Sequence, residues 1–286
     1  MKILFIGPTG MLGKPVAKEL IRQASDISLF GRDINKIQSL FPGAKTAQGD
    51  VFDKNSLVAA MRRIDALYCN LSVLQTSKEK DLQPEREGVD NIIAAARETG
   101  IRRIAYLSSL VHKYEGMNGF NWWAFQIKNT AVEKVKLSGI PYTIFYPSTF
   151  MDCYPFQMMR GNKVAALGSS VAPMWFIAAA DYGKQVAASF RVLTDENREY
   201  NVQGPEPFTF EEGNKVFTDN YKRAKLKTMK APMWIMKFLG LFIQKYNYAW
   251  HICEALNNYP EKFESENTWK ELGRPATTLA AYARSL

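Results

Sequence analysis

The sequence of 286 residues predicts an α/β protein, a doubly wound parallel sheet followed by a smaller, mostly helical C-terminal lobe. In its first half, short apolar runs alternate with longer segments of helical periodicity. That alternation is typical of parallel strands joined by right-handed helical crossovers. The first apolar run leads directly into a glycine turn. After Pro147 the alternation stops, which indicates a second unit of different architecture.

Six strands and five helices are expected in the first half. The predicted strands are Lys2–Gly7, Asp26–Phe30, Lys45–Asp50, Ala66–Cys69, Arg103–Leu107 and Tyr142–Tyr146. The helical patterns between them are Leu12–Arg22, Ile34–Leu40, Lys54–Arg62, Arg86–Thr99 and Phe125–Ser138. In the fourth helix, the apolar residues follow the spacing of a one-faced helix, at Val89, Ile92, Ile93 and Ala96.

The second half is expected to return to the sheet once. A helix beginning at Asp181 and a strand at Glu199–Gln203 precede a break at Pro205–Pro207. We therefore expect residues 1–150, together with 181–203, to form the sheet domain. Residues 151–180 and 204–286 are expected to form the lobe.

Composition narrows the class of protein. With 47% hydrophobic and 23% charged residues, the chain has the composition of a globular protein. The three cysteines lie far apart without CxxC spacing, so neither a disulfide framework nor a zinc site is expected. The opening MKILFIG has the pattern of a strand and not of a signal peptide, which favours a cytoplasmic location.

The formal net charge of +9 is compatible with several anionic partners. The basic residues are scattered, and the nearest approach to a cluster is Lys222–Lys230. This segment is either a solvated surface or a contact for a polyanion or a membrane. The sequence has no zinc-finger spacing, RNA-binding aromatic motif or recognition-helix signature, so no specific nucleic-acid partner is expected.

Gly7, Gly10 and Gly13 follow the first strand in the motif GPTGMLG. Glycines at this spacing permit a sharp turn, close approach of a pyrophosphate and tight packing of the helix on the sheet. The amides at the start of the helix would then bind phosphate. Because the motif lies between an apolar strand and an amphipathic helix, it predicts a dinucleotide-binding domain of the Rossmann type.

The end of the second strand bears on the choice of dinucleotide. In this fold an acid there would bind a free ribose 2′-hydroxyl, whereas an arginine suits a 2′-phosphate. Gly31 stands where an acid could have been, and Arg32 follows it, so NADP is favoured over NAD. Asp33 is expected to cap the helix that begins near Ile34.

Together these motifs resemble the NmrA-like branch of the atypical short-chain dehydrogenase/reductase superfamily. The resemblance is carried by GPTGMLG, FGRD, GDVFD, YCNLS, YLSSL, KNTAVEKVKLSGIPYTIFYPSTFMD, FIAAADYGK and YNVQGPEPFTFEE. It implies that residues 1–150 bind NADP and that the lobe binds substrate. It also implies a set of cofactor contacts: Gly7, Thr9, Gly10, Met11, Leu12, Gly13, Arg32, Asp50, Val51, Asn70, Leu71, Ser72, Ser108, Lys128, Tyr146 and Pro147.

Lys128 is the expected catalytic residue, but the motif around it departs from the superfamily. In the superfamily that this sequence resembles, the ordinary and extended enzymes carry Tyr-x-x-x-Lys. Here Ala124 stands four residues before the lysine. The helical neighbours of Lys128 are all apolar, which places it at the edge of a buried face. Lys128 is either a surface lysine whose stem covers apolar side chains or a ligand of the nicotinamide ribose.

The proton donor stays open at this point. Reduction of a carbonyl needs a proton as well as a hydride. The candidates are Lys128, Tyr114, Tyr146, or a water held by Ser108 or Ser109.

The lobe is rich in aromatic and methionine residues. The segment 229–250 places Trp234, Phe238, Leu241 and Phe242 on one helical stripe. It is too short and too often interrupted by lysine to span a membrane. A lid over an apolar or aromatic substrate, a dimer face and an interfacial membrane helix are the alternatives. The residues Met151, Phe156, Met158, Met159, Met174, Trp175 and Phe176 either line the same pocket or form the lobe core.

Two hypotheses of function follow. The first is an NADP-dependent reductase of a small carbonyl, quinone or unsaturated substrate. The second is a non-catalytic NADP-binding redox sensor that acts through a protein partner. A sugar-nucleotide epimerase is a weaker third, since Ala124 replaces the tyrosine. Monomer and homodimer both remain open.

Overall fold

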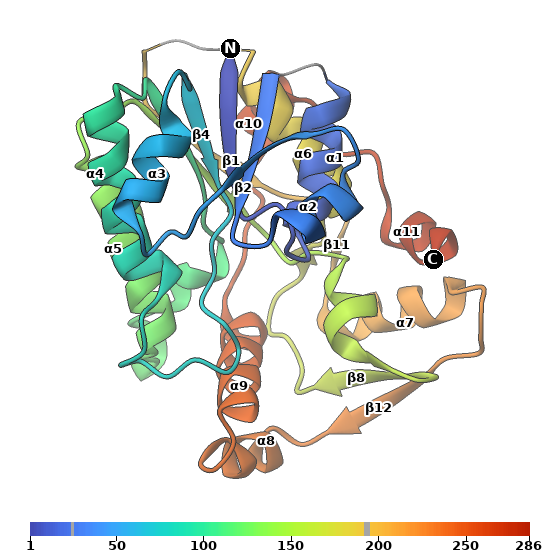
Figure 1. Cartoon of the computed structure of the whole chain (residues 1–286). Helices are drawn as coiled ribbons and strands as arrows, with labels where there is room; N and C mark the ends of the chain where they lie inside the picture. The colour runs from blue at the N-terminus through green and yellow to red at the C-terminus, as the bar shows by residue number, and fades with distance from the viewer. Residues whose placement is uncertain (24–25, 192–194) are drawn as a thin grey trace.

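The computed structural model describes residues 1–23, 26–191 and 195–286. Its centre is a parallel sheet of seven strands in the order β10-β6-β5-β4-β1-β2-β3 (Figure 1). The strands are β1 (Lys2–Ile6), β2 (Asp26–Gly31), β3 (Lys45–Gln48), β4 (Ala66–Cys69), β5 (Arg103–Leu107), β6 (Tyr142–Pro147) and β10 (Arg198–Val202). The chain first winds outward from β1 to β3, then crosses back to β4 on the other side of β1. The predicted doubly wound fold is confirmed.

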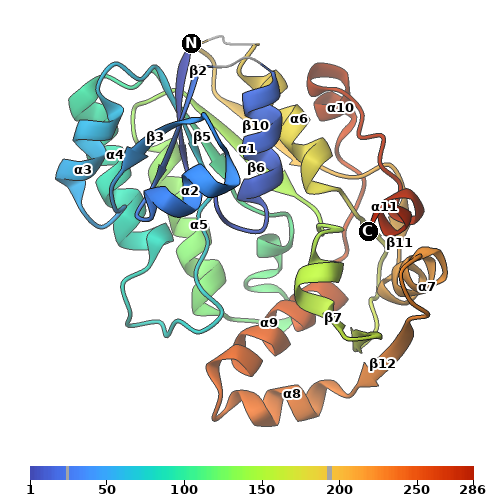
Figure 2. The same cartoon turned by 45° about the vertical axis from the view of Figure 1, so that its right-hand side comes forward.

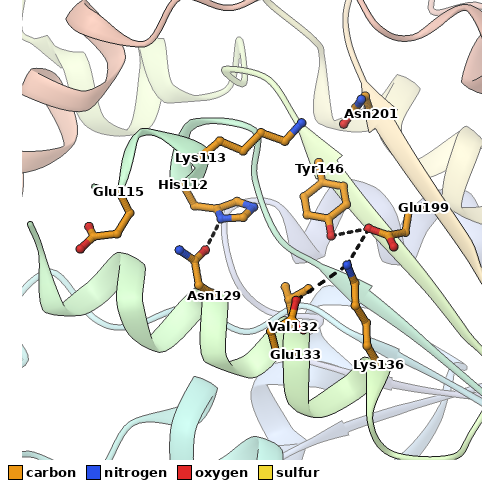
Figure 3. A pocket seen from close by; sticks show the side chains of 10 residues that line it. All are labelled: His112, Lys113, Glu115, Asn129, Val132, Glu133, Lys136, Tyr146, Glu199 and Asn201. Carbon is orange, nitrogen blue, oxygen red and sulfur yellow. Dashed lines mark hydrogen bonds and ion pairs between the residues drawn. The ribbon is translucent and has the colours of Figure 1, made fainter. Parts of the chain in front are cut away.

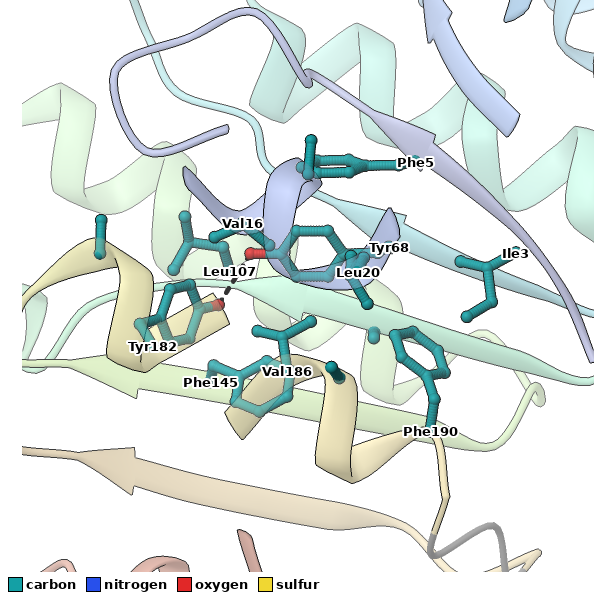
Figure 4. Packing of buried hydrophobic residues seen from close by; sticks show 14 of the residues in the cluster. Ile3, Phe5, Val16, Leu20, Tyr68, Leu107, Phe145, Tyr182, Val186 and Phe190 are labelled. Carbon is teal, nitrogen blue, oxygen red and sulfur yellow. Dashed lines mark hydrogen bonds between the residues drawn. The ribbon is translucent and has the colours of Figure 1, made fainter. Parts of the chain in front are cut away.

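Helices cover both faces of the sheet (Figure 1). One face carries α1 (Gly13–Arg22), α2 (Ile34–Leu40) and α6 (Ala179–Ser189), and the other carries α3 (Lys54–Met61), α4 (Val89–Thr99) and α5 (Trp123–Lys136). On the first face, apolar side chains of β1, α1 and α6 interlock (Figure 4), and a hydrogen bond of 2.9 Å joins the hydroxyls of Tyr68 and Tyr182. Burial of both faces explains why the strands are continuous apolar runs.

The predicted return to the sheet is present. Helix α6 begins at Ala179, two residues before the predicted start, and β10 pairs in parallel with β6. Asp181 is buried in the first turn of α6 and accepts hydrogen bonds from the backbone amides of Ala276 (3.0 Å) and Thr277 (2.7 Å). The aspartate therefore ties the C-terminal segment to the sheet domain.

The lobe is mostly helical, as expected, but it also contains two small sheets (Figure 2). Strand β8 (Lys163–Leu167) pairs with β7 (Met159–Arg160) and with β12 (Lys227–Ala231), and β9 (Met174–Trp175) pairs with β11 (Pro207–Phe208). The lobe helices are α7 (Phe210–Asn220), α8 (Met233–Gly240), α9 (Gln244–Asn258) and α11 (Leu279–Ser285). Met151, Met174 and Phe176 are buried in the lobe core with Phe217, so these three are packing residues.

Helix α10 (Glu266–Leu272) contacts the sheet domain, although its segment was assigned to the lobe. The sequence-based division assigns all of 204–286 to the lobe, whereas α10 lies against β10 and α6. Thr268 donates to the Asn201 carbonyl (2.6 Å) and the Trp269 indole to the Gln203 carbonyl (3.1 Å).

The aromatic segment 229–250 does not form one helix. The chain reverses between α8 and α9, where Gly240 lies so close to Asn247 that a Cβ would come within 2.9 Å of it.

Candidate cofactor-binding site

The glycine turn between β1 and α1 lies at the switch point of the sheet, where β1 and β4 are neighbours. Gly7 has φ 92°, and a Cβ there would lie 2.2 Å from the Asn70 carbonyl oxygen. A Cβ at Gly13 would lie 2.1 Å from the Gly7 oxygen. The chain itself therefore requires both glycines, since no other residue fits.

Gly10 is different because the protein alone does not require it. It is exposed, and the nearest atom to an added Cβ is the Gly7 oxygen at 3.9 Å. Thr9, Met11 and Leu12 are half-buried around it. No side chain caps the first turn of α1. The Lys14 and Val16 amides already donate to the Gly10 and Leu12 carbonyls, so the turn that precedes Lys14 is the part that can face an anion. An open glycine over an uncapped helix start fits a pyrophosphate.

The ends of β2 and β3 hold the residues predicted for the adenosine half. Asp33 caps α2 by accepting from the Lys36 amide (2.9 Å), as predicted. Arg32 is 77% exposed and its guanidinium lies 3.9 Å from Asp50. An exposed pair of this kind contributes little to stability, so Arg32 can reach an anionic ligand at little cost. Val51 follows Asp50, and its carbonyl accepts from the Asn91 side chain (3.0 Å).

The ends of β4 and β5 form the centre of the crevice. The Asn70 amide donates to the Ile6 carbonyl (3.0 Å), which holds the segment Asn70–Ser72 against the glycine turn. Leu71 is buried and Ser72 is exposed. Directly after β5, the hydroxyl of Ser108 is buried and has no hydrogen-bond partner among the described residues. A buried polar atom without a partner is costly, and a ligand in the crevice would satisfy it.

Lys128 does not extend into solvent. Its side chain is only 14% exposed, and its ammonium donates to the carboxylate of Glu85 at 2.5 Å. Glu85 is fully buried at the start of the π-helical turn Pro84–Gly88, which leads into α4. Its carboxylate also accepts from the Val73 amide (3.0 Å) and from the Tyr106 hydroxyl (3.2 Å). The buried carboxylate of Glu85 therefore holds the ammonium of the lysine that the sequence predicts to be catalytic.

Glu85 was not among the residues that the sequence indicated. The one available signal is its position four residues before Val89, in line with the buried stripe of α4. Within the charged stretch PEREG, an acid just before a helix usually reads as a solvated residue that favours the helix N-terminus. Only the fold, which brings α5 beside this turn, identifies its partner.

Tyr248 of α9 is a second residue that the sequence analysis missed. Its hydroxyl lies near the Ser72 side chain, and its ring lies edge-on to Trp122, with centroids 5.0 Å apart. It packs against the buried cluster that contains Ala124. Burial, followed by the negative charge of Glu85, raises the pKa of Tyr248 to about 12. A protonated phenol therefore stands beside Ser72 although position 124 carries none.

Tyr146 and Pro147 complete the predicted set at the end of β6. The Pro147 carbonyl accepts from the Leu110 amide (2.9 Å). The hydroxyl of Tyr146 donates to Glu199 (2.7 Å), and Lys136 forms an ion pair with the same carboxylate (3.0 Å). The Tyr146 ring lines a polar pocket of about 580 Å³ between α5, β6 and β10 (Figure 3). This hydroxyl is therefore already engaged away from the glycine turn.

His112 separates this pocket from Lys128. Its ring stacks on Tyr146, with centroids 5.5 Å apart, and its Nδ1 is paired with the side chain of Asn129. Burial, and then the positive charge of Lys128, lower the pKa of His112 to about 4. The imidazole is therefore neutral at physiological pH.

The carboxyl ends of β1 to β5 thus place most of the predicted residues along one edge of the sheet. Its open glycine, its uncapped helix and the unpaired Ser108 hydroxyl fit a dinucleotide. The fold and these features define a Rossmann-type nucleotide-binding protein.

Comparison with known families agrees with the assignment to the nucleotide-binding proteins. The NAD(P)H-binding family matches residues 7–170, more than half of the chain, and the protein therefore belongs to this family. The predicted membership of the NmrA-like, atypical short-chain dehydrogenase/reductase group is confirmed with it.

Three known proteins illustrate the relationship. Quinone oxidoreductase 2 of Escherichia coli is 27% identical over 72% of this chain and 70% of its own. The photosystem II assembly factor Ycf39 of Synechocystis is 21% identical over 90% of this chain and 78% of its own. The structure of Citrobacter triphenylmethane reductase with NADP(H) superposes with a TM-score of 0.75 over 100% of this chain and 99% of its own, at 19% identity, which shows a shared fold.

Proposed function

We propose that this protein is an NADPH-dependent reductase of a quinone or of another small conjugated carbonyl compound. The observation that carries the proposal is the uncrowded Gly10 in the turn after β1, together with the unpaired hydroxyl of Ser108 after β5 and the buried Lys128, which is linked through Glu85 to Val73 after β4. Several relatives bear names of this class, among them quinone oxidoreductase 2.

Each part of the crevice has a separate task. The turn around Gly10, at the start of α1, binds the pyrophosphate, and Arg32 binds the 2′-phosphate. Ser108 and Lys128 hydrogen-bond the ribose and nicotinamide end. Glu85 fixes the Lys128 ammonium, so the lysine orients the cofactor and does not supply the proton.

Tyr248 is the proton donor that the helix motif lacks. Bound NADPH supplies a hydride to the electrophilic carbon of the substrate, and the Tyr248 phenol gives its proton to the substrate oxygen. The product is the alcohol or hydroquinone, and the phenolate recovers a proton from water through the exposed Ser72 hydroxyl. The high pKa of Tyr248 suits this role because the phenol stays protonated at neutral pH.

Oxidation of NADPH with menadione and with cyclohexenone tests the proposal. Tyr248→Phe should lower kcat by about 100-fold, the usual contribution of a positioned acid, while the Kd for NADPH stays unchanged. Tyr246→Phe is the matched control, because Tyr246 lies on the same helix and is 36% exposed. Wild-type turnover that Tyr248→Phe leaves intact would reject the proton donor but keep the reductase.

The second candidate is a non-catalytic NADP-binding regulator. One observation favours it: Ala124 leaves no phenol on α5, and the Lys128 ammonium is already paired with Glu85. The relative Ycf39 is named as an assembly factor and not as an enzyme. Tight NADPH binding without turnover of either probe would support the regulator, whereas absence of dinucleotide binding in calorimetry would reject both functions.

A further inference from the structure

The apolar surface of the α8–α9 hairpin is unusually exposed. We name this surface, which covers residues 222–246, the basic aromatic tip. Trp234 is 69% exposed, Phe238 57% and Phe242 75%. Of the fourteen large apolar side chains that are exposed among the described residues, seven lie here: Met229, Trp234, Phe238, Leu241, Phe242, Ile243 and Tyr246. Such clustering marks an interaction surface, whereas scattered apolar residues do not.

The same segment carries a one-sided charge. No aspartate or glutamate occurs between Asp219 and Glu254, while seven basic residues do: Lys222, Arg223, Lys225, Lys227, Lys230, Lys237 and Lys245. All seven are exposed, and within the described parts of the chain none of them forms an ion pair. This segment alone accounts for most of the formal net charge of +9.

The aromatic side chains form a continuous edge and not a scattered set. Trp234 and Phe238 are one helical turn apart on α8, and the rings of Phe238 and Phe242 meet edge to face at 5.7 Å. Lys237 stacks over the Trp250 ring at 5.3 Å, beside this edge. In both views α8 lies at the end of the molecule away from the N-terminus (Figures 1 and 2), so nothing in the fold stands between the edge and an approaching surface.

We propose that the basic aromatic tip docks the protein on an anionic lipid bilayer. Aromatic and leucine side chains would enter the boundary between headgroups and acyl chains, and the surrounding lysines would contact anionic headgroups. No helix in the described parts of the chain is long and apolar enough to cross a bilayer, so the contact is interfacial.

Two other occupants explain the surface less well. A substrate lid would turn its largest apolar side chains inward, whereas Trp234 and Phe238 of α8 are exposed. The inward contacts come from Tyr248 and Ile252 of α9. A symmetric dimer would place the same patch against itself, so two sets of unpaired lysines would face each other. Charge complementarity therefore favours an anionic surface.

Cosedimentation with lipid vesicles tests the proposal on the full chain. We expect binding to mixed phosphatidylcholine–phosphatidylglycerol vesicles, little binding to phosphatidylcholine alone, and release by high salt. The double variant Trp234→Ser/Phe242→Ser should weaken binding by at least about tenfold, because two large apolar anchors are lost. Lys230→Gln/Lys245→Gln should weaken it by about 25-fold, since each lysine near an anionic surface contributes about fivefold.

Matched variants elsewhere on the surface provide the control. Leu137→Ser and Phe156→Ser remove side chains that are 79% and 62% exposed outside the tip and should leave vesicle binding unchanged. Circular dichroism of every variant checks that the fold is retained.

Three outcomes would overturn the proposal. The first is no binding to anionic vesicles, and the second is binding that the tip variants and the control variants weaken equally. The third is a dimer in analytical ultracentrifugation that Trp234→Ser/Phe242→Ser dissociates, which would assign the tip to a second copy of the chain. Binding to polyglutamate that is as tight as binding to vesicles and independent of Trp234 would also overturn the proposal, because it would show attraction by charge alone.

Discussion

Replacing Glu85 by glutamine tests whether the buried acid holds Lys128 in place. Glutamine keeps the size of the side chain and an acceptor for the Val73 amide, but it removes the charge that balances the ammonium. The carboxylate is fully buried and the lysine side chain is only 14% exposed. The variant therefore leaves a cation in a largely dry site.

The expected cost follows from this burial. Breaking a buried ion pair on one side costs about 3–5 kcal/mol. We expect the lower end, about 3 kcal/mol, because Lys128 keeps some contact with water. For a protein of this size this corresponds to a fall in Tm of about 6–12 °C. The double variant Glu85→Gln/Lys128→Met should regain at least about 2 kcal/mol relative to the sum of the single changes.

Urea denaturation of the wild type, both single variants and the double variant measures this coupling. NADPH titration by fluorescence separates the two roles, since Lys128→Met should weaken NADPH binding more than Glu85→Gln does. A cost below about 1 kcal/mol for Glu85→Gln, or strict additivity of the two changes, would refute the assignment of Glu85 as the positioning residue.

Three further predictions concern the glycine turn, Arg32 and His112. Gly13→Ala should prevent folding, because its Cβ would lie 2.1 Å from the Gly7 oxygen, whereas Gly10→Ala should fold normally and bind NADPH weakly in calorimetry. Arg32→Ala should lower NADPH affinity by about 10–100-fold, since a charged hydrogen bond to phosphate is lost, and NADH affinity, measured in parallel, should not change. The pKa of His112 is about 4 in the folded protein, below its unfolded value. Between about pH 6.5 and that value, only the unfolded chain takes up the proton. As the pH is lowered across this window, the stability of the fold should therefore decrease by up to about 3 kcal/mol. Over this window His112→Gln should lose less unfolding free energy than the wild type, measured by urea denaturation at the two ends of the window. Equal losses in the two proteins would contradict the burial of a neutral imidazole.

Much of the cofactor crevice could be predicted because its signals are local. A glycine turn, a helix cap and an apolar stripe each act within a few residues, so the positions of Gly7, Gly13 and Asp33 follow from short stretches of sequence. The register of Lys128 was predictable in the same way, since its neighbours one turn away on α5 are apolar. All four of them are buried in the structure: Ala124, Phe125, Ala131 and Val132.

The proposed proton donor, Tyr248, could not be predicted, because no local pattern links α9 to α5. The sequence candidates Tyr114 and Tyr146 lie near the correct strands, yet the Tyr146 hydroxyl is bonded to Glu199 and that of Tyr114 faces the Asn118 side chain at 3.5 Å. Tyr248 lies near Ser72 only because α9 packs against α5 and the turn after β5.

The sequence by itself therefore determined the parallel sheet, the dinucleotide turn and the family. These features depend on periodicity and on backbone conformations that particular residues demand. Only the tertiary structure decided what holds Lys128 and what packs against its helix: Glu85, 43 residues earlier in the chain, and Tyr248 from the lobe. The physical reason is that charge pairing and burial depend on which surfaces meet, and distant segments carry no periodic signal of one another.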